Sequence, residues 1–407
     1  MKNRLIILGS TGSVGRQTLD VIDFLNFNSN DITVLGLSAN SNIAELELQI
    51  RKYRPIFAVV TDKEFYYQLR SRVKDTSTII LCDICGIQEM IFKLKDNCNL
   101  VLNAIVGIDG FLPSIAALQN KIDLALANKE SMVVGGTILR ELATKNCTEI
   151  LPVDSEHYAI FSCLNIRRNL QNQKNNKNLN LKKIVITASG GPFHGKIEED
   201  LENVSLSQTL NHPTYQMGKK ITVDCATLIN KALEIIEAHY LFGINYEDIE
   251  VVIHRQSIIH SMIEFCDNSV IAQMSLPDMK IPIQGVITYP DIFECSRDSI
   301  DWAKLGYLTF ENPKNWENRA LSLAYRAGKY GRLAPVILNS ANEAAVQLFL
   351  ENKIKFLDIL KIVESELCSY ISEDIKSTEL RQEQDIEKII YTDRLIKEKY
   401  TYHTNLS

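Results

Sequence analysis

The start of the chain carries the feature that most constrains its fold, a strand–turn–helix signature. The apolar run "RLIILG" leads into the glycine-rich turn "GSTGSVG" (9–15), and "VGRQTLDVIDFL" follows with apolar residues spaced near the helical period of about 3.6. Short apolar runs and amphipathic stretches then alternate to about residue 150. Repeated β-α units of this kind predict a parallel sheet covered by helices on both faces.

After residue 150 the pattern changes. The segments "KKIVITAS", "IEVVIHR" and "SVIAQMSL" are typical of strands, and one long helix is predicted at 224–242. From about Pro313 the periodicity is mostly helical. We therefore expect an α/β fold with a Rossmann-like N-terminal domain, an α+β second domain and a C-terminal helical domain. The predicted domains are 1–150, 151–290 and 313–407, with a linker at 291–312. The Asn/Lys-rich segment 165–183 is predicted to be a surface loop or a helix extension.

Composition excludes several classes of protein. A net charge of −6 argues against a general nucleic-acid binder, so an anionic ligand needs a local site. No apolar run approaches the roughly 18 residues of a membrane span. Nine cysteines show no regular framework, and the CxxC of Cys82 and Cys85 lacks a second pair at zinc-ribbon spacing. These two are interpreted as buried thiols in a reducing compartment, which predicts a cytoplasmic location.

The glycine-rich turn indicates a dinucleotide site. Glycines between a strand and a helix let the backbone approach a pyrophosphate, which the positive helix N-terminus holds. The spacing is GxxGxxG and not the commoner GxGxxG, so a tight turn without a ligand stays as the alternative. The second strand ends in the neutral segment 38–42, "SANSN", where an NAD site usually carries an acidic residue. NADP is therefore favoured over NAD.

Two carboxylates follow an apolar run in "PVDSEHYAIF" (152–161). Asp154 and Glu156 flank Ser155, and on an extended segment residues two apart point to the same side. Such like charges repel unless a positive group lies between them. The alternative interpretation is a solvated turn that provides a helix N-cap.

The long helix predicted in the second domain has a polar face. Asn230, Lys231 and Glu234 share this face at spacings of three and four residues. A solvated face with an intrahelical ion pair is the alternative. The neighbouring segments add His212, with two lysines, and Ser189 in the turn "ASGGPF". Together these residues are compatible with an anion pocket and a third carboxylate.

Seven motifs occur along the chain in a recognisable order. They are "GSTGSVG", "LANKESMV", "PVDSEHYAIF", "ASGGPF", "HPTYQMGKKITVDCATLINKALE", "SIIHSMIEF" and "PDMKIPI". This series resembles the 1-deoxy-D-xylulose 5-phosphate reductoisomerase family of the non-mevalonate isoprenoid pathway, over essentially the whole chain. The resemblance implies an NADPH- and metal-dependent enzyme that rearranges this sugar phosphate and reduces it to 2-C-methyl-D-erythritol 4-phosphate.

The resemblance also implies a metal site and a substrate site. Asp154, Glu156 and Glu234 would hold Mg²⁺ or Mn²⁺, with Co²⁺ as a further candidate, because all-oxygen ligands suit hard cations. His212 would belong to a lid over about 205–218 that closes on the substrate. The implied catalytic residues are Lys129, Asp154, Glu156, His212 and Glu234. The implied substrate contacts are Ser155, Ser189, His212, Cys225, Asn230 and Lys231, of which Ser189, Asn230 and Lys231 grip the phosphate.

The family's cofactor contacts map onto three groups of positions. The pyrophosphate would meet Thr11, Gly12, Ser13 and Val14. The adenosine phosphate end would meet Ala39, Asn40, Ser41 and Asn42. The groove towards the nicotinamide would be lined by Ala104, Ile105, Asn128, Lys129, Glu130, Gly218 and Met279.

The chain departs from the family pattern at four positions. Tyr215 stands where Trp is usual in the lid, and Cys225 where Ser is usual near the phosphate. Ala232 replaces a Gly, which favours helix, and Arg255 replaces a Pro. A thiol is a weaker hydrogen-bond donor than a hydroxyl, so we expect Cys225→Ser to preserve turnover and to preserve or improve substrate affinity.

Two other functions are compatible with parts of the sequence. A two-domain NADP-dependent dehydrogenase without isomerisation would need no metal. A non-enzymatic dinucleotide sensor would keep the glycine-rich turn without needing three carboxylates and a lid. As partners, the resemblance implies a sugar-phosphate substrate and a second copy of the chain in a homodimer. The net charge argues against nucleic acid, and the short apolar runs argue against a membrane.

Overall fold

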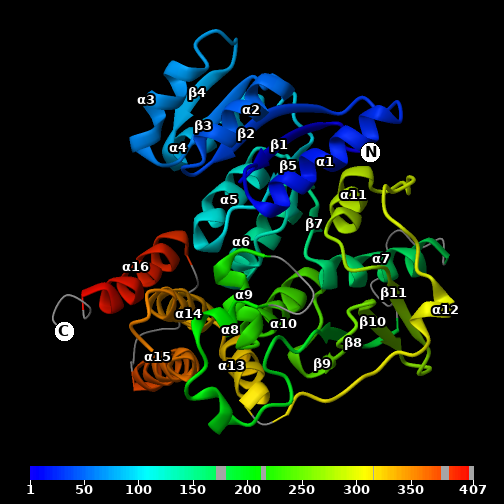
Figure 1. Cartoon of the computed structure of the whole chain (residues 1–407), viewed down its shortest axis with the longest axis vertical. Coiled ribbons are helices and arrows are strands. Elements are labelled where there is room, and N and C mark those ends of the chain that lie inside the picture. Colours follow the sequence, from blue (N-terminus) through cyan, green and yellow to red (C-terminus); the bar gives the residue numbers. More distant parts are fainter. Residues whose placement is uncertain (171–179, 212–216, 315, 377–384, 403–407) are drawn as a thin grey trace. The chain divides into compact units, whose positions relative to one another are not determined.

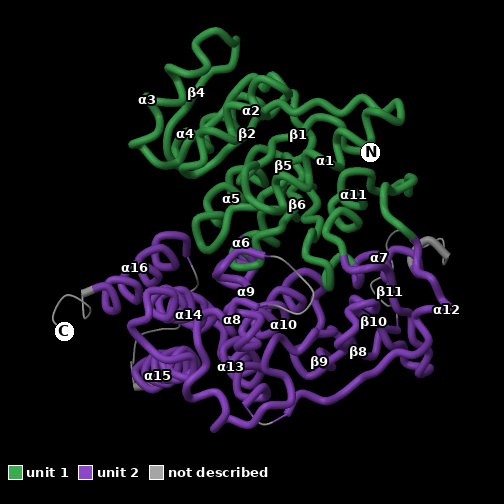
Figure 2. The backbone as a smooth tube through the Cα atoms, viewed as in Figure 1, with its two compact units in different colours: residues 1–131, 139–158, 278–298 green, residues 132–138, 159–277, 299–407 purple. Residues whose placement is uncertain are grey.

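The computed structural model describes residues 1–170, 180–211, 217–314, 316–376 and 385–402. It forms two compact units, each built from separate stretches of chain (Figure 2). Unit 1 comprises 1–131, 139–158 and 278–298, and unit 2 comprises 132–138, 159–277 and 299–407. Because the units interleave along the chain, the division at 150, 290 and 312 stays a prediction.

Unit 1 is organised around a seven-stranded sheet with the order β4-β3-β2-β1-β5-β6-β7, in which every paired neighbour is parallel (Figure 1). Its strands are β1 (Arg4–Leu8), β2 (Thr33–Ala39), β3 (Phe57–Val60), β4 (Ile79–Cys82), β5 (Leu100–Asn103), β6 (Asp123–Leu126) and β7 (Ile150–Pro152). The first six lie in the apolar runs "RLIILG", "ITVLGLSA", "IFAVVT", "TIILC", "LVLNAIVG" and "IDLALAN" of the alternating pattern that predicts the sheet. The predicted parallel sheet is therefore confirmed.

Helices connect these strands. They are α1 (Ser13–Phe27), α2 (Ile43–Tyr53), α3 (Lys63–Arg72), α4 (Asp83–Leu94), η1 (Gly107–Gly110), α5 (Phe111–Gln119) and α6 (Lys129–Asn146). A further helix of unit 1, α11 (Lys280–Thr288), comes much later in the chain and connects none of these strands. The strand order runs outward from β1 in both directions, so right-handed crossovers place α1–α3 on one face and α4–α6 on the other. Contacts of α2 with α3 and of α4 with α5 agree with this. The order reverses between β1 and β5, and in such sheets a ligand crevice lies outside the carboxyl ends of the strands at that point.

The CxxC segment lies at the edge of this sheet. Cys82 ends β4 and is half-buried, whereas Cys85 lies in the first turn of α4 and is exposed. The prediction that both thiols are buried is therefore wrong for Cys85, because the strand ends between them and the helix turns Cys85 outward.

Unit 2 contains a mixed four-stranded sheet with the order β11-β10-β8-β9. Strands β8 (Leu181–Ala188) and β9 (Ile249–Ile253) are parallel, while β10 (Ile259–Phe265) is antiparallel to both β8 and β11 (Val270–Met274). The three predicted strands are thus confirmed, and β10 adds a fourth.

The helix predicted at 224–242 is wrong as a single element. It is two helices, α9 (Lys219–Ala226) and α10 (Ile229–Phe242), separated by Leu228 in a left-handed conformation with φ of 58°. The Thr227 hydroxyl accepts a hydrogen bond from the amide of Ile229 at 3.4 Å and donates back to α9. This side chain supplies the backbone partners that a continuous helix would have supplied itself.

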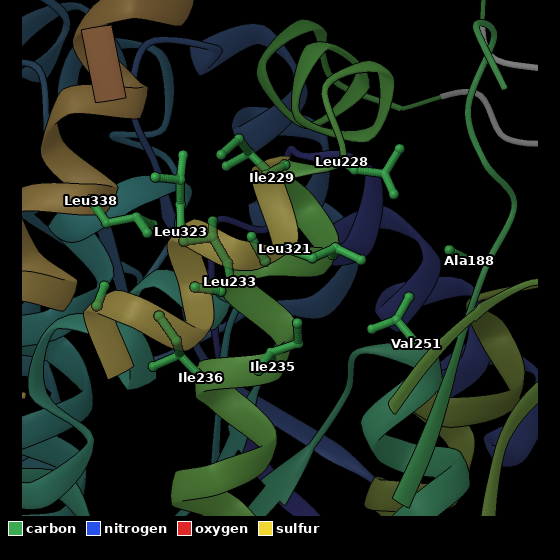
Figure 3. Packing of buried hydrophobic residues seen from close by; sticks show 14 of the residues in the cluster. Ala188, Leu228, Ile229, Leu233, Ile235, Ile236, Val251, Leu321, Leu323 and Leu338 are labelled. Atoms are coloured by element: carbon green, nitrogen blue, oxygen red, sulfur yellow. The ribbon is translucent and has the colours of Figure 1, made fainter. Parts of the chain in front are cut away.

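The core of unit 2 forms where α10 meets the C-terminal helices (Figure 3). Leu233 and Ile236 of α10 pack in one buried cluster with Leu321 and Leu323 of α13 and Leu338 of α14. Each buried Leu or Ile of this kind contributes about 1.5–3 kcal/mol. The C-terminal helices are α12 (Trp302–Leu305), α13 (Trp316–Tyr330), α14 (Ala334–Leu350), α15 (Phe356–Lys376) and α16 (Ile386–Tyr402), so the predicted helical C-terminus is confirmed.

The remaining elements are short or pass between the units along the chain. They are α7 (Ser155–Leu170), η2 (Glu198–Leu201), α8 (Leu206–Thr209) and η3 (Tyr246–Asp248). The segment 165–183 extends α7 to residue 170, its part 171–179 lies outside the described residues, and β8 begins at 181. In the part of the chain that the structure describes, no helix combines the length and apolarity required to cross a bilayer.

Candidate active site

The glycine-rich turn lies at the sheet's switch point and depends on close backbone packing. Gly9 has a φ of +76°, and its amide donates to the Ser38 hydroxyl of β2 at 3.1 Å. A Cβ atom at Gly9 would lie 2.7 Å from the carbonyl oxygen of Ala104, directly after β5. A Cβ atom at Gly15 would lie 2.3 Å from the carbonyl oxygen of Gly9. Only glycine at both positions lets β1, the turn and α1 approach this closely.

The N-terminus of α1 has the features of an anion site. Within the described residues no side chain caps it, and its first turn has no acidic residue. The positions predicted to meet the pyrophosphate lie here, and each is exposed or partly exposed: Thr11, Gly12, Ser13 and Val14. Free N–H groups and the positive end of the helix dipole favour an anion at this place.

The end of β2 is neutral, as its sequence requires. Ala39 is buried, whereas the next three residues, 40–42, are exposed. Asn40 accepts a hydrogen bond from the Thr61 hydroxyl at 2.9 Å, and Asn42 caps α2 by accepting from the amide of Glu45 at 3.2 Å. The asparagines therefore stabilise the loop, and no carboxylate occurs at 38–42 to repel a 2′-phosphate.

Buried amides order the carboxyl ends of β5 and β6. The Asn128 amide donates to the Gly107 carbonyl at 2.7 Å and to Glu130 at 3.1 Å. Its oxygen accepts from the amide of Ser131 at 2.9 Å, which caps α6. Asn128 thereby fixes the helix start that carries Lys129. The predicted groove residues Ala104 and Ile105 follow β5 and are partly buried.

The two carboxylates of Asp154 and Glu156 follow the carboxyl end of β7. Lys129 forms an ion pair with Asp154, and their side chains are 7% and 12% exposed. The Asp154 carbonyl accepts from the amide of Tyr158 at 2.8 Å, which places Asp154 at the N-cap position of α7. The N-cap interpretation is therefore right for the backbone, but a fully solvated turn is wrong.

The prediction that Asp154 and Glu156 point to the same side of an extended segment is wrong. The segment is not extended, because α7 begins at Ser155 and Glu156 lies in its first turn. Residues two apart in a helix do not face one another. The Ser155 hydroxyl instead donates to the Glu156 carboxylate at 2.5 Å.

In unit 2, the polar face of α10 is also mostly withdrawn from solvent. Glu234 is 0% exposed and Lys231 is 4% exposed, so the solvated-face interpretation is wrong. The carboxylate of Glu234 accepts from the Asn230 amide and from the Lys231 ammonium, both at 2.5 Å. The predicted trio therefore forms one hydrogen-bonded cluster in which Lys231 and Glu234 are buried and Asn230 is half-buried.

The "ASGGPF" turn contacts the junction of α9 and α10. Gly190 and Gly191 have φ angles of +81° and +63°, and a Cβ atom at Gly191 would lie 2.8 Å from the carbonyl oxygen of Cys225. The amide of Gly191 donates to the Ser189 hydroxyl at 3.3 Å. Cys225 is half-buried in α9, beside the break that starts α10. The structure thus brings the predicted phosphate-binding segments of unit 2 together.

Asp224 is not among the predicted site residues. Its buried carboxylate accepts from Lys220 at 2.7 Å and from the Asn342 amide of α14 at 2.8 Å. The spacing of four residues could have indicated the pair with Lys220. Nothing local indicates Asn342.

The remaining predicted residues have the following positions. His212 and Tyr215 lie outside the described residues. On the near side of the predicted lid, Ser205 caps α8 in a capping box with Gln208, and on its far side Gly218 is the N-cap of α9. Met279 precedes α11 in unit 1 and is partly buried.

Three family models match the chain. The 1-deoxy-D-xylulose 5-phosphate reductoisomerase model matches 5–136, and two models of C-terminal domains of the same enzyme match 150–242 and 274–399. The curated 1-deoxy-D-xylulose 5-phosphate reductoisomerase of Clostridium tetani is 45% identical and covers 98% of this chain and 100% of its own. The chain belongs to the 1-deoxy-D-xylulose 5-phosphate reductoisomerase family. The resemblance drawn from the seven motifs is therefore confirmed.

Other members of the family agree in sequence and in structure. The 1-deoxy-D-xylulose 5-phosphate reductoisomerase of Thermoanaerobacter pseudethanolicus is 44% identical, covering 97% of this chain and 98% of its own. A reductoisomerase solved with NADPH, fosmidomycin and magnesium has a TM-score of 0.89 and 34% identity, covering 99% of this chain and 98% of its own. The Zymomonas mobilis reductoisomerase solved with NADPH has a TM-score of 0.85, 34% identity and 98% coverage of both chains.

Proposed function

We propose that this chain is a 1-deoxy-D-xylulose 5-phosphate reductoisomerase that rearranges its substrate and reduces the resulting aldehyde with NADPH. The product is 2-C-methyl-D-erythritol 4-phosphate, an isoprenoid precursor. Full-length family membership carries this proposal, because the family models include the cofactor turn, the acidic pair and the phosphate-binding segments. A two-domain NADP-dependent dehydrogenase without isomerisation is not favoured.

Asp154, Glu156 and Glu234 would hold one divalent cation. The donor set fits Mg²⁺ or Mn²⁺, because all three groups are carboxylates and hard cations prefer oxygen. Asp154 and Glu234 each form an ion pair with a lysine ammonium in their own unit, so a divalent cation would compete with these ammonium groups for the carboxylate oxygens. When bound, the metal supplies Lewis-acid polarisation of the substrate oxygens.

The protein's own side chains bind and orient the substrate. In unit 2, Ser189, Asn230 and Lys231 grip the phosphate, and Cys225 adds a weak donor at the end of α9. In unit 1, Ser155 contacts the carbon backbone, and Lys129 stabilises negative charge on the reacting oxygens. His212 closes the site with the lid and excludes water.

Unit 1 binds the cofactor. The uncapped N-terminus of α1 receives the pyrophosphate, and the neutral end of β2 accepts the 2′-phosphate of NADPH. Of the predicted contacts, 39–42, 104–105, 128–130 and 279 belong to unit 1, whereas Gly218 belongs to unit 2. Asn128 supports it by capping the helix that presents Lys129.

The test follows NADPH oxidation with 1-deoxy-D-xylulose 5-phosphate in the presence of Mg²⁺ or Mn²⁺ and again with a chelator. We expect oxidation only when both the substrate and a divalent metal are present, with 2-C-methyl-D-erythritol 4-phosphate as the product by mass spectrometry. Oxidation that survives the chelator would instead support a dehydrogenase without isomerisation. No oxidation with any divalent metal would refute the proposal.

We further propose that the protein is a cytoplasmic homodimer. We also propose that the chain divides at 150, 290 and 312 into its functional segments. Large exposed apolar side chains support a partner surface in unit 2, since Trp302 is 65% exposed and Tyr307 is 77% exposed. The scattered cysteines support a reducing compartment. Light scattering at several protein concentrations measures the oligomeric state, and a monomer throughout would contradict the homodimer.

A further inference from the structure

A pocket of about 310 Å³ in unit 2 lies beside the turn assigned to phosphate binding. It is lined by Gly191, Pro192, Phe193, Lys196, Gln208, Asn211 and Arg255. The set contains two cations, two amides and no carboxylate. Arg255 is also the position where the family usually has proline, so this chain adds a charge there. We propose that this pocket binds the phosphate dianion of the approaching substrate before it reaches Ser189.

The two cations of the pocket are not engaged by carboxylates among the described residues. Neither Lys196 nor Arg255 forms an ion pair in the part of the chain that the structure describes, although both are exposed. The Lys196 ammonium lies 5.5 Å from the ring centroid of Phe193, a geometry that limits its range of motion. In a chain with a net charge of −6, two cations on one pocket create a local field that attracts dianions.

Two carboxylates of segments near the pocket have their own partners. Glu317 pairs with His194 at 2.6 Å, and Glu311 pairs with Lys314 at 3.4 Å. The Glu311 pKa is lowered, chiefly by the charge of His194. Glu311 and Glu317 are therefore held by groups other than Lys196 and Arg255.

The polar side chains of the pocket suit a ligand with several acceptor oxygens. The carbonyl oxygen of the Gln208 side chain is used by the Ser205 amide at 2.8 Å, which leaves its nitrogen as a donor. Arg255 offers a planar fork of donors that matches phosphate geometry. Gly191 belongs both to the pocket and to the turn that carries Ser189, so the two sites are contiguous.

The inference rests on the proposed substrate and is tested by steady-state kinetics against ionic strength. We expect Arg255→Gln to lower kcat/KM for 1-deoxy-D-xylulose 5-phosphate by about three- to tenfold at about 0.01 M salt. The loss should appear in KM and shrink as salt screens the charge, while kcat and the KM for NADPH stay unchanged. Lys196→Gln should behave similarly.

Arg326→Gln is the matched control, because it removes another exposed arginine charge, from α13 of the same unit. Equal losses in Arg255→Gln and Arg326→Gln would overturn the inference, as would wild-type kcat/KM in Arg255→Gln at low salt. A variant with wild-type kcat/KM but weaker inhibition by inorganic phosphate would also overturn it, because the pocket would then hold free phosphate. Lack of turnover in the wild-type protein would refute the proposed function instead.

Discussion

Replacing Glu234 by glutamine should destabilise unit 2 even in protein freed of metal by a chelator. The carboxylate and the Lys231 ammonium lie 2.5 Å apart, with the two side chains 1% and 5% exposed. Glu234→Gln keeps the shape of the side chain but leaves a buried ammonium beside a neutral amide. Breaking a buried ion pair by removing one partner costs about 3–5 kcal/mol.

The predicted shift in melting temperature is large enough to measure. For a unit of this size, about 1 kcal/mol corresponds to about 2–4 °C. A loss of about 3 kcal/mol therefore lowers the Tm of unit 2 by about 6–12 °C. Differential scanning calorimetry in the presence of chelator measures this shift without any contribution from bound metal.

Two further variants separate the buried pair from a general charge effect. Glu89→Gln breaks an exposed pair with Lys93, whose side chains are 47% and 48% exposed, and should cost at most about 1 kcal/mol. The double variant Lys231→Met with Glu234→Gln should recover part of the Tm lost by the single variant. If Glu234→Gln melts within a degree or so of the wild type, or the double variant recovers nothing, the reasoning is refuted.

Three more predictions follow from other parts of the molecule. Gly15→Ala should lower the Tm and weaken NADPH binding in fluorescence titrations, because its new Cβ would lie 2.3 Å from the Gly9 carbonyl oxygen and overpacking costs about 1–3 kcal/mol. In Gly12→Ala the new Cβ would lie 3.3 Å from that oxygen, so the Tm should stay near that of the wild type. Equal Tm losses in the two variants would contradict this reasoning. Burial raises the pKa of Cys98 to about 12 and that of Cys163 to about 11. Their neutral thiols therefore stabilise the fold below about pH 8.5, and this contribution is lost as the pH rises towards those values. Rapid alkylation of either thiol in native protein at neutral pH, measured by mass spectrometry, would contradict this burial. Cys225→Ser should keep kcat and preserve or lower the substrate KM, and a large loss of activity would show that the position is misassigned.

Much of the fold follows from patterns that are local in the sequence. Six of the seven strands of unit 1 and the C-terminal helices were predicted because apolar periodicity records which face of each element is buried. The glycine-rich turn was also predicted from local sequence, because the glycines within residues 9–15 allow the backbone conformations and close approaches that the turn needs. The site residues came from short motifs, and their assignment to a common reaction came from family resemblance.

The tertiary structure decided what depends on partners distant in the sequence. Leu228 takes a left-handed conformation that the sequence does not predict, because the residue is not a glycine. The hydrogen bonds of Thr227 and the packing of α9 and α10 impose this conformation. The Asp224–Asn342 hydrogen bond joins residues 118 positions apart, and the ion pair of Lys129 with Asp154 joins the ends of β6 and β7. Local sequence fixes where a side chain can point along its own element, whereas burial and pairing are set by whichever element packs against it.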